Sequence, residues 1–249
     1  MKISILIPIY NRNNFKNLII YNLKNLEYNK NNLELVILDD GTDLFIKNEN
    51  ELNYFKEQIY PIELNYINDK SGRKTIGYKR NKLVKNAKHN ICAYMDSDDL
   101  YAPSYLTHSI NVMNNGKFSI VGSNQMLFIY PTEDMFDKWI ITGIQCGEKR
   151  MIHEATMVFN KKYFKAMGGF ANSSKGEGVK MFDGMDTNKI GLTQINKIMF
   201  CICHKNNTVE KEMFKNNNTQ DIKLSQIDKY KIVQALCSNI RTLPVGLEI

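Results

Sequence analysis

The first half of the chain alternates between short apolar runs and stretches in which apolar residues recur with helical spacing. Four of the runs have the length of buried strands; they are residues 3–9 (ISILIPI), 33–38 (LELVIL), 62–67 (IELNYI) and 90–95 (NICAYM). Helical spacing lies between them, over 15–26, 49–59 and 76–87. Strands that alternate with helices form right-handed βαβ units, and such units build a parallel sheet. The pattern therefore predicts an α/β fold with a mostly parallel twisted sheet flanked by helices.

The second half has a less regular pattern. Strand-like runs are found at 119–123, 125–130, 152–159 and 197–204, and a helical stretch at 161–170 ends in glycines. An asparagine-rich stretch then leads to a last helix over 222–240. At 249 residues the chain has the length of one large α/β domain, and no linker or internal repeat divides it. We therefore predict one domain over 1–220, with halves 1–110 and 111–220, followed by a C-terminal helix and tail over 221–249.

Two of the predicted strands end in acidic residues. Asp39 and Asp40 follow the second strand, and the run Asp96, Asp98 and Asp99 follows the fourth. Because ligands of open α/β sheets bind beyond the carboxyl ends of the strands, both acid clusters are expected at one binding edge. Carboxylates so close together repel one another and need a cation. Hard oxygen ligands suit Mg²⁺ or Mn²⁺, which keep positions open for phosphate oxygens.

Three common sites with similar residues are excluded. An EF-hand loop starting at Asp96 would need glycine as its sixth residue and glutamate as its twelfth, but Tyr101 and Thr107 stand there. The chain has no G-x-x-x-x-G-K-[ST] loop and no G-x-G-x-x-G turn, which argues against P-loop and dinucleotide-binding proteins. The metal is therefore expected to be held by carboxylates together with the diphosphate of a ligand.

Charge and cysteine content narrow the class of protein further. The net charge of +7 favours an anionic partner, but no basic stripe interleaved with aromatic residues indicates nucleic acid. An odd count of five scattered cysteines, without a secretory signal, favours a reducing compartment such as the cytoplasm. Cys201 and Cys203 lie in an apolar run, where core packing is favoured over metal binding. No apolar run is long enough to span a bilayer.

Three segments taken in order resemble family 2 glycosyltransferases, which have the Rossmann-like GT-A fold. They are ISILIPIYNR, LELVILDDGT and IGYKRNKLVKNAKHNICAYMDSDDLY, in the last of which a G-x-x-R-N helix leads into a D-x-D strand. The resemblance is strong over 1–110 and weaker beyond. It implies a metal-dependent enzyme, with Mn²⁺ or Mg²⁺, that moves a hexosyl or N-acetylhexosaminyl group from a UDP-sugar to an acceptor hydroxyl with inversion. Residues 1–110 would bind the donor and 111–220 the acceptor, which is a glycan, a protein or a small molecule.

The resemblance also implies which residues bind the nucleoside. Pro8, Tyr10 and Arg12 match the segment that packs on the nucleotide base. Asp40 matches the residue that accepts a hydrogen bond from a ring nitrogen of uracil. An aromatic side chain that stacks and a carboxylate that accepts from an N–H are chemically suited to these tasks. Tyr10 could instead cap the first strand.

A second group of residues is implied for the diphosphate, the ribose and the metal. Lys79 and Arg80 match the basic position that faces the diphosphate. Asp96, Ser97 and Asp98 match the D-x-D motif, in which the two acids hold the ribose and the metal. Because Lys79, Lys82 and Lys85 share one helix, Arg80 could also be a solvated residue of that helix.

The second half offers further candidates. His204 resembles a late histidine that completes the metal site, and a surface position is the alternative. His153 resembles a residue lining the acceptor pocket, and a satisfied half-buried histidine is the alternative. Trp139 is expected to pack rather than to stack on a sugar, and Asp99 could share the tasks of the D-x-D acids.

The catalytic base is the least regular part of the resemblance. Family members place two acids at the start of a helix, whereas this chain has GEGVKMFDGMD. Glu177 matches the first acid, and Gly178 replaces the second. We therefore predict Glu177 as the base that takes the acceptor proton, with Asp183 as runner-up and Asp186 further along.

Two other functions fit parts of the pattern. A sugar-phosphate nucleotidyltransferase has a similar sheet but needs a glycine-rich basic loop after the first strand, and IYNRNNFKN is not such a loop. A catalytically inactive protein that binds a glycan or nucleotide would not need the complete set of Arg80, Asp96 and Asp98.

Overall fold

The computed structural model describes residues 1–215 except 131–139, 146, 205–206 and 208–209. The predicted last helix over 222–240 and Trp139 lie outside the described residues. In the described part of the chain, no helix has the length and apolar character needed to cross a membrane.

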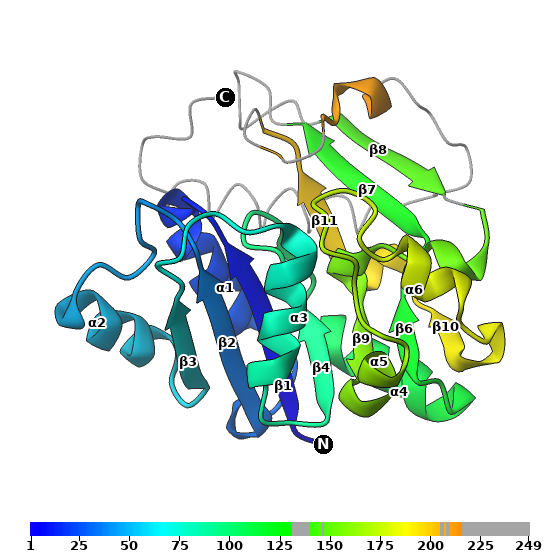
Figure 1. Ribbon diagram of the computed structural model, residues 1–249, viewed down its shortest axis with the longest axis horizontal. Coiled ribbons are helices and arrows are strands. Elements are labelled where there is room, and N and C mark those ends of the chain that lie inside the picture. Colours follow the sequence, from blue (N-terminus) through cyan, green and yellow to red (C-terminus); the bar gives the residue numbers. More distant parts are fainter. Residues whose placement is uncertain (131–139, 146, 205–206, 208–209, 216–249) are drawn as a thin grey trace.

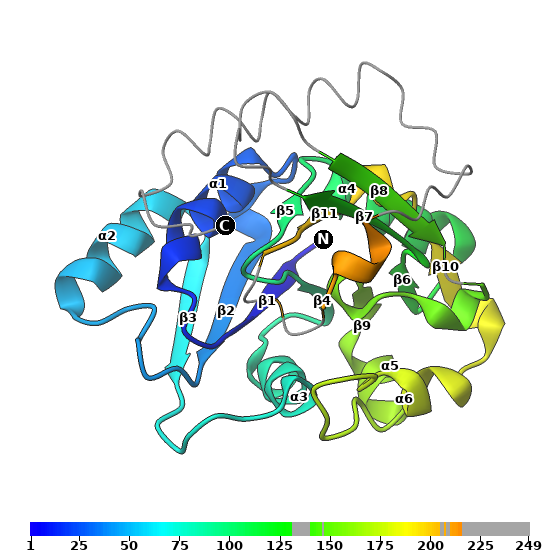
Figure 2. The same cartoon turned by 90° about the horizontal axis from the view of Figure 1, so that it is seen from above.

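The described chain is built around a seven-stranded sheet, with helices on both of its faces (Figures 1 and 2). Its strands are β1 (Ile3–Ile9), β2 (Leu33–Asp39), β3 (Glu63–Asn68), β4 (Ile91–Tyr94), β6 (Ile120–Gly122), β9 (Val158–Asn160) and β10 (Ile190–Leu192). Their order across the sheet is β10-β6-β9-β4-β1-β2-β3. Only β9 runs antiparallel to its neighbours within this sheet. The prediction of a mostly parallel α/β sheet is therefore confirmed.

Alternate residues of the central strands pack on two layers of helices. The helices are α1 (Lys16–Asn25), α2 (Glu49–Ile59), α3 (Ile76–Asn86), α4 (Tyr105–Gly116), α5 (Lys161–Ala166) and α6 (Val179–Asp183). Ile5 and Ile7 of β1 share one apolar cluster with Leu18 of α1. Leu6, between them, belongs to a second cluster with Leu83 of α3. Successive strand side chains point to opposite faces, so a continuous apolar run is what a sheet covered on both faces requires.

A second sheet lies beyond the carboxyl ends of the central strands (Figure 1). It consists of β5 (Leu100–Tyr101), β11 (Met199–Ile202), β7 (Gln125–Tyr130) and β8 (Ile140–Gln145), in that order. Phe128 of β7 and Phe200 of β11 belong to the same apolar cluster as Ile7 of β1. One core therefore continues from the main sheet into the second sheet, and the space between them is where a site can form.

The sequence prediction missed α4, β8 and β10, and it was wrong over residues 152–159, where it expected one strand. Glu154–Thr156 form a 3-10 turn, and only Val158–Asn160 form a strand. The hydroxyl of Thr156 donates to the carbonyl of His153 at 2.7 Å and accepts from the amide of Ser123 at 2.8 Å. A hydroxyl that binds nearby main chain competes with strand pairing, and here it stabilises the turn.

Candidate active site

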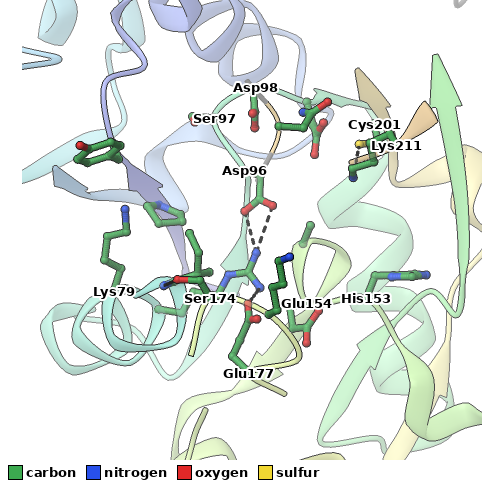
Figure 3. Close-up of a pocket in the computed structure, with 18 of the residues that line it drawn as sticks. Lys79, Asp96, Ser97, Asp98, His153, Glu154, Ser174, Glu177, Cys201 and Lys211 are labelled. Atoms are coloured by element: carbon green, nitrogen blue, oxygen red, sulfur yellow. Dashed lines mark hydrogen bonds and ion pairs between the residues drawn. The ribbon is translucent and has the colours of Figure 1, made fainter. Parts of the chain in front are cut away.

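A cleft of about 930 Å³ lies between the carboxyl ends of the main sheet and the second sheet (Figure 3). Most of its charged lining residues come from four places: the end of β1, the start of α3 with the loop before it, the end of β4, and the second half of the chain. They include Arg12, Arg73, Lys74, Lys79, Arg80, Asp96, Asp98, Asp99, Glu154, Lys175, Glu177 and Lys211. Pro8, Tyr10, Ser97 and His153 line the same cleft.

Arg80 neutralises the first acid of the run that follows β4. Its Nη2 lies 2.9 and 3.1 Å from the two carboxylate oxygens of Asp96, and its Nη1 lies 2.9 Å from Oε1 of Glu177. The arginine is 5% exposed, so both ion pairs form in a largely desolvated place. Charge-assisted bonds of this kind fix the geometry of both partners. Arg80 thus joins the first half of the chain to the second half.

The G-x-x-R-N start of α3 explains how Glu177 reaches that arginine. A Cβ atom at Gly77 would lie 1.9 Å from the carbonyl oxygen of Ala171, so glycine permits the loop to approach the helix. Asn81 donates to the carbonyl of Phe170 at 2.8 Å and accepts from its amide at 3.0 Å. The helix therefore holds the loop that carries Glu177.

Asp98, two residues after Asp96, lies beside two basic groups. Its Oδ2 is 3.1 Å from Nε2 of His204 and 3.4 Å from Nη2 of Arg12. Burial would raise the pKa of Asp98, but the bond to His204 and the charge of Arg12 hold it below its usual value. Asp98 is therefore ionised and available as a ligand.

A metal fits at Asp98 and His204 with a small protein ligand set. The described residues contain no group of three or more His, Cys, Asp or Glu side chains that could hold an ion. Asp96, the other predicted ligand, is directed to Arg80. Mg²⁺ is commonly bound through one or two carboxylates plus substrate phosphates, and Mn²⁺ accepts similar ligands, so this sparse set suits a metal that arrives with a diphosphate.

The remaining residues of the acid run are enclosed. Asp99 accepts from the amide of Ile202 in β11 at 3.1 Å, and burial raises its pKa well above the usual value. Ser97 is buried at the cleft wall. Cys201, on the same strand as Ile202, accepts from Nζ of Lys211 at 3.1 Å. The contact of Asp99 with Ile202 fastens the acid run to the second sheet.

Asp40 and Lys79 form a buried ion pair beneath the cleft. Nζ of Lys79 lies 2.8 Å from Oδ1 of Asp40, and the amide of Lys74 donates to Oδ2 at 2.6 Å. Burial lowers the pKa of Lys79, and Asp40 opposes that shift. The Asp40 side chain is fully enclosed and is not part of the cleft lining. The structure thus directs Lys79 to Asp40; the bond from Asp40 to uracil stays a prediction.

Two basic residues that the sequence analysis did not select line the cleft near Tyr10. The guanidinium carbon of Arg73 is 4.4 Å from the centre of the Tyr10 ring. Lys74 lines the cleft beside it. Both belong to the stretch SGRK, which Thr75 alone separates from α3, and two basic residues ahead of a helix at the binding edge were an available signal.

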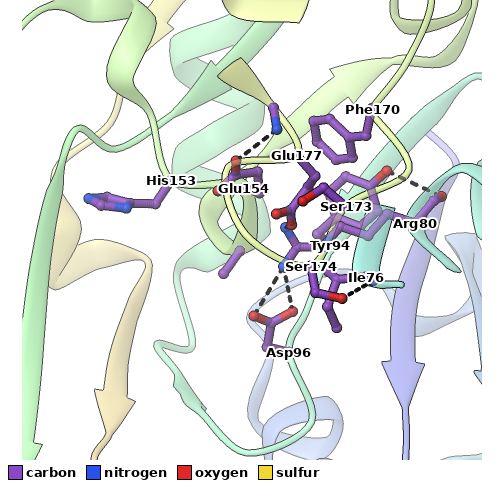
Figure 4. A network of polar contacts seen from close by, with 12 residues as sticks. Ile76, Arg80, Tyr94, Asp96, His153, Glu154, Phe170, Ser173, Ser174 and Glu177 are labelled. Carbon is purple, nitrogen blue, oxygen red and sulfur yellow. Dashed lines mark hydrogen bonds and ion pairs between the residues drawn. The ribbon is translucent and has the colours of Figure 1, made fainter. Parts of the chain in front are cut away.

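The second half supplies an acid that the sequence analysis also missed. Glu154 lines the cleft and accepts from the amide of Gly178 at 3.2 Å (Figure 4). Burial raises the pKa of Glu177, with Arg80 opposing. Burial lowers the pKa of His153 to about 4, so its imidazole is neutral at pH 7. Asp183 is exposed at the end of α6 and is not part of the cleft lining.

Comparison with known sequences gives one family. The family model described as glycosyl transferase family 2 matches residues 4–197. A relative from Rickettsia typhi, named an uncharacterized glycosyltransferase, is 26% identical over 187 residues, which are 70% of this chain and 54% of the relative. Another of that name, from Rickettsia felis, is 24% identical over 179 residues, which are 68% of this chain and 28% of the relative. The matched region thus spans only part of these longer proteins.

Comparison with solved structures gives the fold and, with the family match, completes the assignment. Residues 1–349 of S. aureus TarS in complex with UDP-GlcNAc superpose with a TM-score of 0.64 at 15% identity, over 99% of this chain and 68% of that one. Mannosyltransferase PcManGT from Pyrobaculum calidifontis, in complex with GDP-Man and Mn²⁺, superposes with a TM-score of 0.55 at 15% identity, over 77% of this chain and 56% of that one. This chain has the GT-A fold of these enzymes and belongs to glycosyltransferase family 2.

Proposed function

We propose that the protein transfers a sugar from a UDP-sugar to an acceptor hydroxyl, with a divalent metal and with inversion at the anomeric carbon. The observation that carries the proposal is the ionised Asp98 with His204 beside it, at the edge of a cleft that also presents Arg12 and Arg73. One carboxylate, one imidazole and nearby cations suit a metal-bound diphosphate.

The donor binds along the wall formed by β1, β4 and α3. Tyr10, held under the guanidinium of Arg73, gives a flat surface for the base. Asp98 and His204 would hold Mn²⁺ or Mg²⁺, and the ion would supply positive charge for the departing diphosphate. Among the neighbours, TarS was solved with UDP-GlcNAc and PcManGT with GDP-Man and Mn²⁺, which supports a nucleotide-sugar and a metal here.

The acceptor enters from the side of the second sheet, opposite the donor. Its hydroxyl oxygen attacks the anomeric carbon in line with the bond to the diphosphate, and one displacement of this kind inverts the configuration. An acid of the cleft must take the acceptor proton within hydrogen-bond reach. The sugar is a hexose or N-acetylhexosamine, and the acceptor is a glycan, a protein or a small molecule.

Turnover of a panel of nucleotide-sugars tests the proposal. The protein is incubated with each donor and Mn²⁺ or EDTA, and release of the nucleoside diphosphate is measured with and without candidate acceptors. We expect release from a UDP-sugar with Mn²⁺, and loss of it by about 10²-fold or more in Asp98→Asn, the order of several kcal/mol of lost charge stabilisation. Glu57→Gln, an exposed substitution on α2, is the matched control and should retain full activity.

Two outcomes would replace the proposal. Release of pyrophosphate from UTP and a sugar 1-phosphate, without release of UDP from UDP-sugars, would indicate a nucleotidyltransferase. Metal-dependent binding of UDP-sugars without any turnover would indicate a binding protein.

A further inference from the structure

We propose that Glu154, through its Oε2 atom, takes the proton of the acceptor hydroxyl, in place of Glu177. The inference rests on the proposed glycosyl transfer and assigns one residue of that same cleft. Glu154 belongs to the turn at 154–156, distant in sequence from Glu177, and Figure 4 shows the two carboxylates next to one another.

Glu177 is held by an ion pair that a proton would break. Its Oε1 accepts from Nη1 of Arg80 at 2.9 Å. The guanidinium keeps its charge at any working pH, and its buried Nε has no hydrogen-bond partner among the described residues. Protonating Glu177 would remove one of the two carboxylates that compensate this buried cation. The main task of Glu177 is therefore to hold Arg80, and through it Asp96.

Glu154 occupies the space that a side chain after Glu177 would fill. A Cβ atom at Gly178 would lie 2.7 Å from Oε1 of Glu154 and 2.6 Å from the ring of Phe182. Glycine at this position therefore lets the carboxylate of Glu154 approach the main chain from another part of the fold. The amide of Gly178 donates to that same Oε1 at 3.2 Å. The residue after Glu177 is thus a glycine, and the carboxylate of Glu154 occupies the place where its side chain would be.

The second oxygen of Glu154 is available for chemistry. Among the residues that the structure describes, the Gly178 amide is the one donor that reaches the carboxylate, and it binds Oε1. Glu154 lines the cleft, as do its neighbours His153 and Ala155. The charge of Glu154 is also close enough to Arg80 to help stabilise the guanidinium cation. A carboxylate with one oxygen anchored and one open is suited to general-base catalysis.

The step balances without any further reactant. The acceptor oxygen forms a bond to the anomeric carbon as the bond from that carbon to the diphosphate oxygen breaks, and the electron pair leaves with UDP. The acceptor proton moves to Oε2 of Glu154 and is later released to water.

Glu154→Gln tests the assignment, because glutamine keeps the volume and the acceptor oxygen for the Gly178 amide. We expect kcat for transfer to fall by about 10²-fold or more, the usual contribution of a general base, with KM for the donor and metal-dependent UDP binding unchanged. In Glu154→Ala the lost carboxylate leaves space, so added formate should restore part of the rate. Glu57→Gln and Glu57→Ala are the matched controls and should neither lose activity nor respond to formate.

The outcomes separate this inference from the proposed function. Full transfer activity in Glu154→Gln, with an active wild type, would overturn the assignment of Glu154 alone. A fall in activity accompanied by an equal loss of UDP binding, and no response of Glu154→Ala to formate, would assign the residue a structural role instead. Absence of any transfer by the wild type would overturn the proposed function and this inference together.

Discussion

The two walls of the cleft differ in how they hold their charged side chains. The donor-side wall, formed by the ends of β1 and β4 and the start of α3, pairs its acids with basic side chains: Asp40 with Lys79, and Asp98 with Arg12. The acceptor-side wall, formed by the turn at 154–156, the loop at 168–178 and the second sheet, holds Glu154 through a main-chain amide. Side-chain ion pairs therefore hold the acids of one wall, whereas a main-chain amide holds Glu154 in the other and leaves its second carboxylate oxygen open.

Arg80 is the residue that joins the two walls, and its removal should have the largest effect. In Arg80→Met, Asp96 and Glu177 lose their shared cation, so we expect the free energy of unfolding to fall by about 3–5 kcal/mol, as for other broken buried pairs. Urea unfolding followed by circular dichroism measures this loss in the free energy of unfolding. Lys82→Met, on the same helix, breaks the partly exposed pair with Asp69 and should cost only about 0–1 kcal/mol. Equal losses in the two variants would show that the walls are not joined through Arg80.

Tyr10 tests the donor-side wall by itself. Removing its ring in Tyr10→Ala should weaken UDP binding by about 1–3 kcal/mol, the usual contribution of an aromatic side chain that stacks on a base. Isothermal titration calorimetry of UDP binding in the presence of Mn²⁺ measures this change in binding free energy. Tyr10→Phe should bind UDP as the wild type does, and Tyr54→Ala, at an exposed position of α2, serves as the control. If Tyr10→Ala bound UDP normally, the base would have to lie elsewhere.

His153 gives a smaller effect that is confined to the acceptor-side wall. Because burial lowers its pKa to about 4, the folded protein binds fewer protons at this site than the unfolded chain, whose histidine has a pKa near 6.5. The contribution of the neutral imidazole to the free energy of unfolding is complete above pH 6.5. It is lost as the pH falls from 6.5 towards 4. Between pH 7 and 5 we expect the free energy of unfolding of the wild type to fall by about 1–2 kcal/mol because of this histidine. His153→Gln should not show this part of the pH dependence. Parallel pH profiles of unfolding for the two proteins would contradict the shifted pKa.

The same contrast explains what the sequence could predict. On the donor side, apolar runs and helical spacing gave β1, β2 and α3 nearly to the residue, because local patterning specifies such elements. The position of Asp98 after the carboxyl end of β4 then predicted that it would lie at a binding edge. His204 came only from the family resemblance, and the structure places it beside Asp98.

The acceptor side depends on contacts between residues far apart in the sequence. The proximity of Glu154 to Gly178 follows from a turn that the strand-like run 152–159 concealed. The ion pair of Arg80 with Glu177 likewise joins a helix to a loop almost a hundred positions later, which single-sequence patterns do not encode. Asp183, chosen as a runner-up by its place in the chain, is exposed outside the cleft.

The central claim, that the donor-side wall binds a nucleoside diphosphate together with a metal at Asp98, is tested most directly by thermal unfolding with UDP. Unfolding is compared in UDP with Mn²⁺, UDP with EDTA, and Mn²⁺ alone, for the wild type and Asp98→Asn. We predict that UDP with Mn²⁺ stabilises the wild type most, by about 2.7 kcal/mol at a hundredfold excess over Kd, and that Asp98→Asn loses this metal-dependent part while melting normally without ligand. Stabilisation by UDP that is the same with EDTA as with Mn²⁺, or unchanged in Asp98→Asn, would contradict the claim.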